Sequence, residues 1–115
     1  MQVTKRFRFD SAHHLPGYPG KCARPHGHGY LLEVTVEGPV QPDGLVMDFY
    51  ELKRVVEEEV VDRLDHRDLN ELLENPSAEN VALWIWERLE GLPLAEIRLY
   101  ETPDAWVTLR KGDPR

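Results

Sequence analysis

Residues 30–37 read Tyr-Leu-Leu-Glu-Val-Thr-Val-Glu, and this stretch decides the class of fold. Three of its apolar residues are spaced two apart: Leu32, Val34 and Val36. A period of two indicates a β-strand with one face toward a core. Residues 2–9 repeat the pattern, with aromatic residues at Phe7 and Phe9 and basic residues between them. Residues 10–29 are rich in proline and glycine, so we predict a long ordered loop there, of the kind that usually carries function.

Two amphipathic helices follow these strands. The first is predicted from about Asp48 or Tyr50 to Leu64, because one apolar stripe runs along it. That stripe consists of Leu52, Val55, Val56, Val60 and Leu64. The second begins at Ser77 as its cap, or at the proline before it, and ends near Gly91. Its stripe consists of Val81, Trp84, Ile85 and Leu89.

Residues 95–101 and 105–111 alternate as two further strands. The order β-β-α-α-β-β predicts an α+β fold, with a four-stranded antiparallel sheet and both helices on one face, in one domain over residues 1–115. Such a sheet leaves its other face and both edges open. Exposed edges invite pairing with another chain, so we expect a symmetric homo-oligomer, with a charged-edge monomer as the alternative.

Composition limits the class of protein further. The 115 residues carry a net charge of −7, which argues against wholesale nucleic-acid binding. No apolar stretch approaches the ~18 residues of a membrane span, and no signal peptide is visible. The single cysteine, Cys22, cannot form an internal disulfide, which fits a reducing cytoplasm. Several lysines and arginines precede residue 30, and this asymmetry predicts an anion-binding end.

Three histidines give the strongest chemical signal. His26 and His28 form an H-x-H pair at the start of a strand, where side chains two apart point to one face. His13, at the end of the first strand, supplies a third ring, whereas His14 points the other way. Three protein ligands with an open fourth position are typical of catalytic zinc, so we predict a zinc site. Ligand type alone leaves iron or another divalent ion open, and ordinary loop histidines are the alternative interpretation.

Three further positions suggest acid–base or binding chemistry. Cys22 lies in a glycine-flanked loop whose lysine and arginine would favour the thiolate; an inert loop thiol is the alternative. Asp65 and His66 could form a proton relay if a turn brings them together, or His66 could simply complement a helix dipole. Glu101 could bind a guanidine-like edge, or be a solvated glutamate at the sheet edge.

Together these residues resemble the 6-pyruvoyltetrahydropterin synthase family. The shared segments follow the family's order from residue 7 to about 111: Phe9-Asp10-Ser11-Ala12-His13, Cys22-x3-His26-Gly27-His28, Gly44-Leu45-Val46-Met47-Asp48-Phe49, Leu64-Asp65-His66, Pro76-Ser77-Ala78-Glu79-Asn80 and Glu101-Thr102. The spacing of three residues between Cys22 and the H-G-H motif is similar to that of the bacterial 6-carboxytetrahydropterin synthases of queuosine and deazapurine biosynthesis. The pyruvoyl-forming branch of the family has a longer insertion there. Ala78 departs from the family, which commonly has a hydroxyl residue at this position.

The resemblance implies a tunnelling fold, in which trimers join their sheets into a barrel and pair into homohexamers. The implied site residues are the zinc ligands His13, His26 and His28, the catalytic Cys22, Asp65 and His66, and the pterin-binding Glu101, Ser77 and Glu79. Cys22 would act as base, with the Asp–His pair relaying protons from a neighbouring subunit.

The implied reaction converts 7,8-dihydroneopterin triphosphate to 6-carboxy-5,6,7,8-tetrahydropterin and releases triphosphate and acetaldehyde. One alternative is a 6-pyruvoyltetrahydropterin synthase, which eliminates triphosphate and keeps the side chain. The other is a non-catalytic, zinc-stabilised binding protein, which would tolerate the loss of Cys22.

Overall fold

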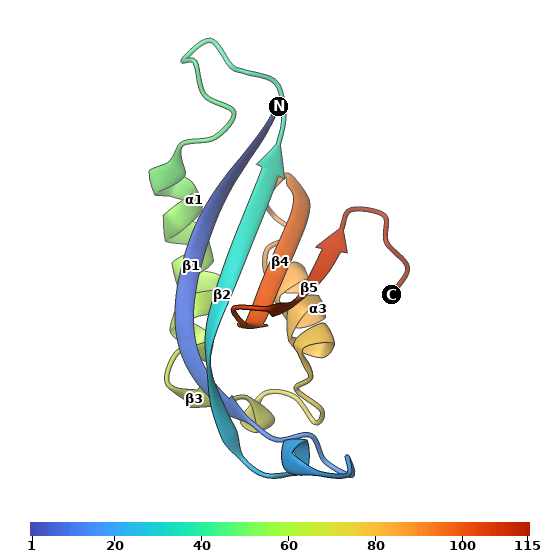
Figure 1. The fold of residues 1–115 in the computed structure, drawn as a ribbon. Coiled ribbons are helices and arrows are strands. Elements are labelled where there is room, and N and C mark those ends of the chain that lie inside the picture. Colours follow the sequence, from blue (N-terminus) through green and yellow to red (C-terminus); the bar gives the residue numbers. More distant parts are fainter.

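A computed structural model describes residues 1–115 apart from the side chain of Cys22. These residues form a mostly antiparallel sheet with the strand order β3-β1-β2-β4-β5, and the helices cover one of its faces (Figure 1). The strands are β1 (Gln2–His13), β2 (His26–Glu37), β3 (Arg67–Asp68), β4 (Leu94–Thr102) and β5 (Ala105–Arg110). The α+β class is confirmed, but the sheet has five strands rather than the predicted four.

The additional strand is β3, which pairs in parallel with β1 at Ser11 and Ala12. Two residues carry no periodicity, so the sequence could not reveal this strand. The predicted loop over residues 10–29 was also too long, because the pairing of β1 with β2 continues from Asp10 opposite Gly29 to His13 opposite His26. Glycines in this part of β2 end the apolar alternation while the backbone pairing continues. The connection is therefore residues 14–25, including the short 3-10 turn η1 (Lys21–Ala23).

The first predicted helix is confirmed as one continuous helical run. It consists of α1 (Phe49–Val56), the π-helical η2 (Glu57–Val61) and α2 (Asp62–Leu64). At its start, the Asp48 carboxylate accepts a hydrogen bond from the Tyr50 backbone N–H at 2.8 Å. After a 3-10 turn, η3 (Leu69–Glu71), the second helix is α3 (Ala78–Arg88). Ser77 caps α3 as predicted, because its hydroxyl accepts a hydrogen bond from the Asn80 backbone N–H at 3.1 Å.

The π-helical turns keep the first helix's buried residues on one line. Four residues spaced four apart are at most 2% exposed: Leu52, Val56, Val60 and Leu64. In an α-helix of 3.6 residues per turn, a spacing of four drifts around the axis. The i→i+5 turns of η2 hold more residues per turn and reverse this drift. Apolar side chains spaced four residues apart are therefore buried against the sheet along the whole helical run.

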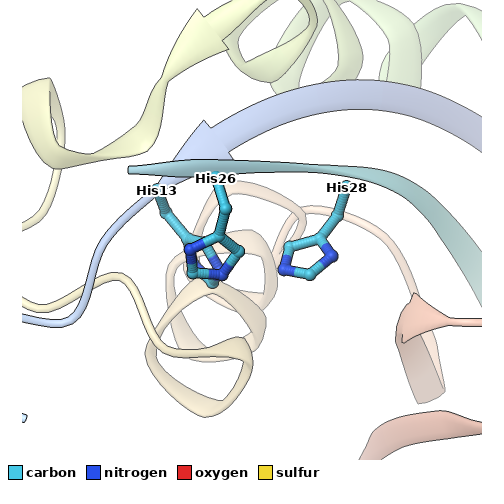
Figure 2. Close-up of side chains that lie close together, drawn as sticks. All are labelled: His13, His26 and His28. Carbon is cyan, nitrogen blue, oxygen red and sulfur yellow. The ribbon is translucent and has the colours of Figure 1, made fainter. Parts of the chain in front are cut away.

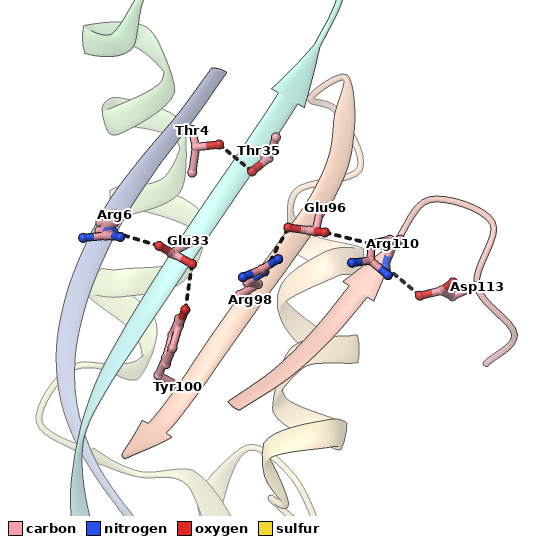
Figure 3. Close-up of polar contacts among 9 residues, drawn as sticks. All are labelled: Thr4, Arg6, Glu33, Thr35, Glu96, Arg98, Tyr100, Arg110 and Asp113. Atoms are coloured by element: carbon pink, nitrogen blue, oxygen red, sulfur yellow. Dashed lines mark hydrogen bonds and ion pairs between the residues drawn. The ribbon is translucent and has the colours of Figure 1, made fainter. Parts of the chain in front are cut away.

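The core lies between the sheet and the helices, and the opposite face of the sheet is polar. On that open face Glu33 accepts hydrogen bonds from Arg6 at 2.7 Å and Tyr100 at 3.2 Å (Figure 3). Nearby, Glu96 accepts hydrogen bonds from Arg98 and Arg110. Exposed ion pairs of this kind contribute little to stability, but they keep this face hydrated. No helix in the described part of the chain has the length and apolar character needed to cross a bilayer.

Candidate metal centre

The paired ends of β1 and β2 bring three predicted histidines together. His13 lies directly opposite His26 in the antiparallel register, and His28 is two residues further along β2 on the same face. The three rings point to one side of the strands (Figure 2). Their centroids are 4.5 Å (His13–His26), 5.0 Å (His13–His28) and 4.8 Å (His26–His28) apart, and one nitrogen of each ring lies within 4.8 Å of the others. The prediction that these imidazoles cluster is therefore confirmed.

Backbone carbonyls set the tautomers of two of these rings. The Nδ1 atom of His13 lies 2.7 Å from the carbonyl oxygen of Pro76, and Nδ1 of His26 lies 2.7 Å from that of Arg24. A carbonyl oxygen can only accept a hydrogen bond, so each Nδ1 carries the hydrogen. The Nε2 atom of each ring then keeps its lone pair. Metal-bound histidines typically have this arrangement, with the other ring nitrogen donating to a carbonyl or carboxylate.

The donor set fits a divalent cation. The Nε2 atoms of His13 and His28 are buried, and neither has a hydrogen-bond partner among the residues that the structure describes. Buried polar atoms almost always have a partner, so two neighbouring ring nitrogens without one indicate a ligand site. Burial lowers the pKa of His28, with His13 and His26 adding to the effect against an opposing rise from Glu101. The ring is thereby kept in the neutral form that binds metals.

Glu101, predicted as a pterin ligand, lies beside this cluster. Its Oε1 atom is 3.3 Å from Nε2 of His28, although the pair is not aligned as a hydrogen bond. The Glu101 side chain is 30% exposed, so its carboxylate is accessible to a ligand. A carboxylate acceptor therefore adjoins the three imidazole rings.

Asp65 and His66 belong to a second group, with Asp10. His66 has a φ of 57°, and its backbone N–H donates to the Asp10 carbonyl at 2.6 Å. This turn places Nδ1 of His66 3.0 Å from Oδ1 of Asp65, so the two adjacent side chains do meet. The hydrogen bond from the Asp10 backbone N–H, followed by that of His66, lowers the pKa of Asp65. Within one chain this group is separate from the three histidines.

The remaining predicted residues lie at the start of α3 and in η1. The Ser77 hydroxyl is used as the helix cap, Glu79 is exposed in the first turn, and Ala78 is buried. Ser77 and Glu79 line an open cavity of about 560 Å³ with residues 15–19 and Asn75. The side chain of Cys22 lies outside the described part of the chain.

Sequence reasoning missed Tyr30 and the two carbonyls that orient the rings of His13 and His26. Tyr30 lies one further step of two beyond His28 on β2, so continuing the strand period past the histidines would have found it. The Pro76 carbonyl carries no signal in the sequence, because any residue supplies one. Pro76 is 63 residues from His13 in the sequence, and only the folded chain brings the two together.

A helix-covered, mostly antiparallel sheet with three imidazoles converging at the end of one strand pair defines a small α+β protein with a strand-borne histidine cluster that could hold a metal ion. The family described as 6-pyruvoyl tetrahydropterin synthase matches residues 2–112, and the chain belongs to this family. The expected family resemblance is thereby confirmed over nearly the whole chain.

Three similar proteins carry three different names. The chain is 43% identical over 105 residues to "Putative 6-carboxy-5,6,7,8-tetrahydropterin synthase" of Archaeoglobus fulgidus, covering 90% of each chain. It is 42% identical over 113 residues to a dihydroneopterin monophosphate aldolase of Pyrococcus furiosus, covering 94% of this chain and 96% of that one. The solved Caenorhabditis elegans 6-pyruvoyl tetrahydropterin synthase superposes with a TM-score of 0.87 at 28% identity, covering 97% of this chain and 96% of the other. All three names are those of enzymes of pterin chemistry.

Proposed function

We propose that this chain is a zinc-dependent 6-carboxytetrahydropterin synthase. The observation that carries the proposal is the pair of buried, unpartnered Nε2 atoms of His13 and His28 next to the Glu101 carboxylate. The reaction takes 7,8-dihydroneopterin triphosphate and one water to 6-carboxy-5,6,7,8-tetrahydropterin, acetaldehyde and triphosphate. The 43% identity to the Archaeoglobus protein supports this product, which would enter queuosine and deazapurine biosynthesis in the cytoplasm.

Glu101 would hold the pyrimidine edge of the pterin. The N–H groups of that edge are donors, and a carboxylate accepts two of them in a charge-assisted pair. Because Glu101 is 3.3 Å from His28, a pterin held there would have its side chain next to the three imidazoles. Zinc held by His13, His26 and His28 would supply Lewis acidity toward the side-chain oxygens and make the adjacent carbon-bound protons more acidic.

The open cavity at the start of α3 supports the assignment of the other substrate residues. Ser77 and Glu79 face this cavity together with the connection between β1 and β2. Pro76, whose carbonyl holds His13, directly precedes Ser77. The predicted pterin-binding segment and the metal centre are thus joined by one hydrogen bond, so a substrate at one would lie close to the other.

Proton transfer would use Cys22 as base and the Asp65–His66 pair as relay. A positioned base typically accelerates such a step by about 10²–10⁴. The His66 side chain is 79% exposed and is separate from the histidine cluster of its own chain, so we assign it to the site of a neighbouring subunit. This requires an assembly, and we propose a homohexamer built as a dimer of trimers. The outer edge of β5 has no strand partner within the described residues and is available for it.

The similarity to the Pyrococcus protein favours a second candidate, a dihydroneopterin monophosphate aldolase. Retro-aldol cleavage of that substrate would release a phosphorylated two-carbon aldehyde and leave a hydroxymethyl group on the pterin. Both reactions need an electrophilic centre, a carboxylate for the pterin and a base, so the site geometry is compatible with each.

The deciding experiment is mass spectrometry of the products after zinc-loaded protein is incubated with each phosphate ester. We expect 6-carboxytetrahydropterin and acetaldehyde from the triphosphate. A 6-pyruvoyl product would assign the chain to the triphosphate-eliminating enzymes, and hydroxymethylpterin from the monophosphate would assign it to the aldolases. Absence of turnover in protein shown to bind zinc would support a non-catalytic binding protein.

A further inference from the structure

Tyr30 shares the strand face that carries two of the three histidines. It follows His26 and His28 at intervals of two on β2 and is 1% exposed. On β1 its direct partner is Phe9, and the two rings stack with centroids 5.0 Å apart and an interplanar angle of 11°. The Tyr30 ring is therefore held from one side by a second buried aromatic residue.

On its other side Tyr30 contacts ligands from both strands. Its ring meets His28 edge to face at 5.6 Å and 77°, and His13 at 6.2 Å and 84°. Edge-to-face contacts at these separations are a preferred arrangement of aromatic rings. The Tyr30 hydroxyl is 3.4 Å from Nδ1 of His13, whereas the Pro76 carbonyl is 2.7 Å from the same nitrogen. The hydroxyl contact is the longer and weaker of the two.

His28 depends on this ring more than the other ligands do. His13 and His26 each have a backbone carbonyl on Nδ1 that fixes the ring orientation. His28 has no such hydrogen bond among the described residues, and the Glu101 carboxylate next to it is not aligned as an acceptor. Packing is therefore what remains to orient the His28 imidazole.

We infer that Tyr30 is a positioning residue of the metal centre: its ring, packed against Phe9, holds the imidazoles of His13 and His28 so that both Nε2 atoms face a common point. The inference rests on the metal centre of the proposed function but not on the reaction catalysed there. Partners that orient metal-bound histidines typically change metal affinity by about 10–100-fold when they are removed.

The test is titration of the metal-free full-length protein with Co²⁺, read by visible absorption and as a dissociation constant. Tyr30→Phe keeps the ring, so it should bind within about 3-fold of the wild type with the same spectrum. Tyr30→Met and Tyr30→Leu remove the ring and should bind about 10–100-fold more weakly, with an altered band. Phe7→Leu is the matched control, because Phe7 is the neighbouring buried aromatic on the same face of β1. It should lower stability without changing the spectrum.

Should both ring-deleting variants be unfolded, Phe9→Leu gives the same test with Tyr30 retained. Releasing the stack should weaken Co²⁺ binding several-fold relative to Phe7→Leu. The inference is refuted if folded Tyr30→Met or Tyr30→Leu binds Co²⁺ with wild-type affinity and spectrum. If both of these variants are unfolded, it is refuted by equal Co²⁺ affinities of Phe9→Leu and Phe7→Leu. Equal losses in Tyr30→Phe and Tyr30→Met refute it too, as does a wild type that binds no Co²⁺. A wild type that binds Co²⁺ but turns over no pterin would refute the proposed function and leave this inference standing.

Discussion

The proposed zinc site predicts that zinc stabilises the folded protein and that replacing His26 by alanine removes this stabilisation. The metal-free protein keeps two buried Nε2 atoms, of His13 and His28, without partners. Each such atom costs about 1–3 kcal/mol, so about 2–6 kcal/mol is available for a ligand to recover. His26 lies at the strand end and is half-buried, so its removal leaves a small cavity while taking away one of the three proposed ligands.

The expected size of the effect follows from binding linkage. Free zinc at 100 times its dissociation constant stabilises a folded protein by about 2.7 kcal/mol. For a chain of 115 residues this corresponds to a rise in Tm of about 11 °C. Loss of a direct ligand should weaken binding at least about 100-fold, since removal of an indirect partner already costs about 10–100-fold. At the same zinc concentration His26→Ala should then gain about 0.4 kcal/mol, or less than about 2 °C.

Thermal unfolding followed by tryptophan fluorescence measures this difference, with zinc or chelator present and the protein concentration held constant. His14→Ala is the matched control, because His14 bonds to Asn70 and lies outside the cluster. This control should keep the full shift. A zinc-induced rise in Tm that is as large in His26→Ala as in the wild type would show that the histidine cluster does not hold the metal.

Three further outcomes follow from the proposed roles. Cys22→Ala should retain zinc and assembly but lose about 10²–10⁴-fold in turnover of the pterin triphosphate, and unchanged turnover in a steady-state assay would contradict its role as base. Glu101→Gln loses charge-assisted hydrogen bonds of about 1.5–3 kcal/mol, so kcat/KM should fall about 10–100-fold while zinc content, measured by atomic emission, stays the same. Because the pKa of Asp65 lies below its ordinary 3.8 in the folded protein, its stabilising effect is present above that pH and is lost as the pH falls through the lowered value. The stability difference between wild type and Asp65→Asn in urea should therefore be larger at pH 5 than at pH 3, and equal differences would argue against this electrostatic contribution.

The sequence predicted those parts of the fold that repeat with a regular period. The strand pattern around residues 30–37 and the stripe ending at Leu64 depend on burial of many side chains, so their periods survive local exceptions. Capping by Ser77 was predictable because a single side chain satisfies a local backbone donor. The histidine cluster was predictable because a spacing of two fixes which face each ring shares.

What could not be predicted depends on contacts between distant residues. The parallel pairing of β3 with Ser11 and Ala12 involves two residues and no pattern. The contact between Asp65 and His66 needs the left-handed backbone of His66, which is held by the hydrogen bond from its N–H to the Asp10 carbonyl on β1. The Pro76 carbonyl determines which ring nitrogen of His13 is free. Every residue has a backbone carbonyl, so the sequence does not mark this one.

The π-helical segment η2 also sets the direction in which the chain leaves the first helix. In an α-helix each residue advances by about 100° around the axis, so one residue more or fewer changes the angular position of everything after it. If the residues of η2 were wound as regular α-helix instead, each would advance further around the axis, and Leu64 would rotate away from the sheet. The turn at Asp65 and His66 would rotate with it and leave Asp10, so the side chains proposed to serve a neighbouring active site depend on the helical phase set by η2, which ends four residues before Asp65.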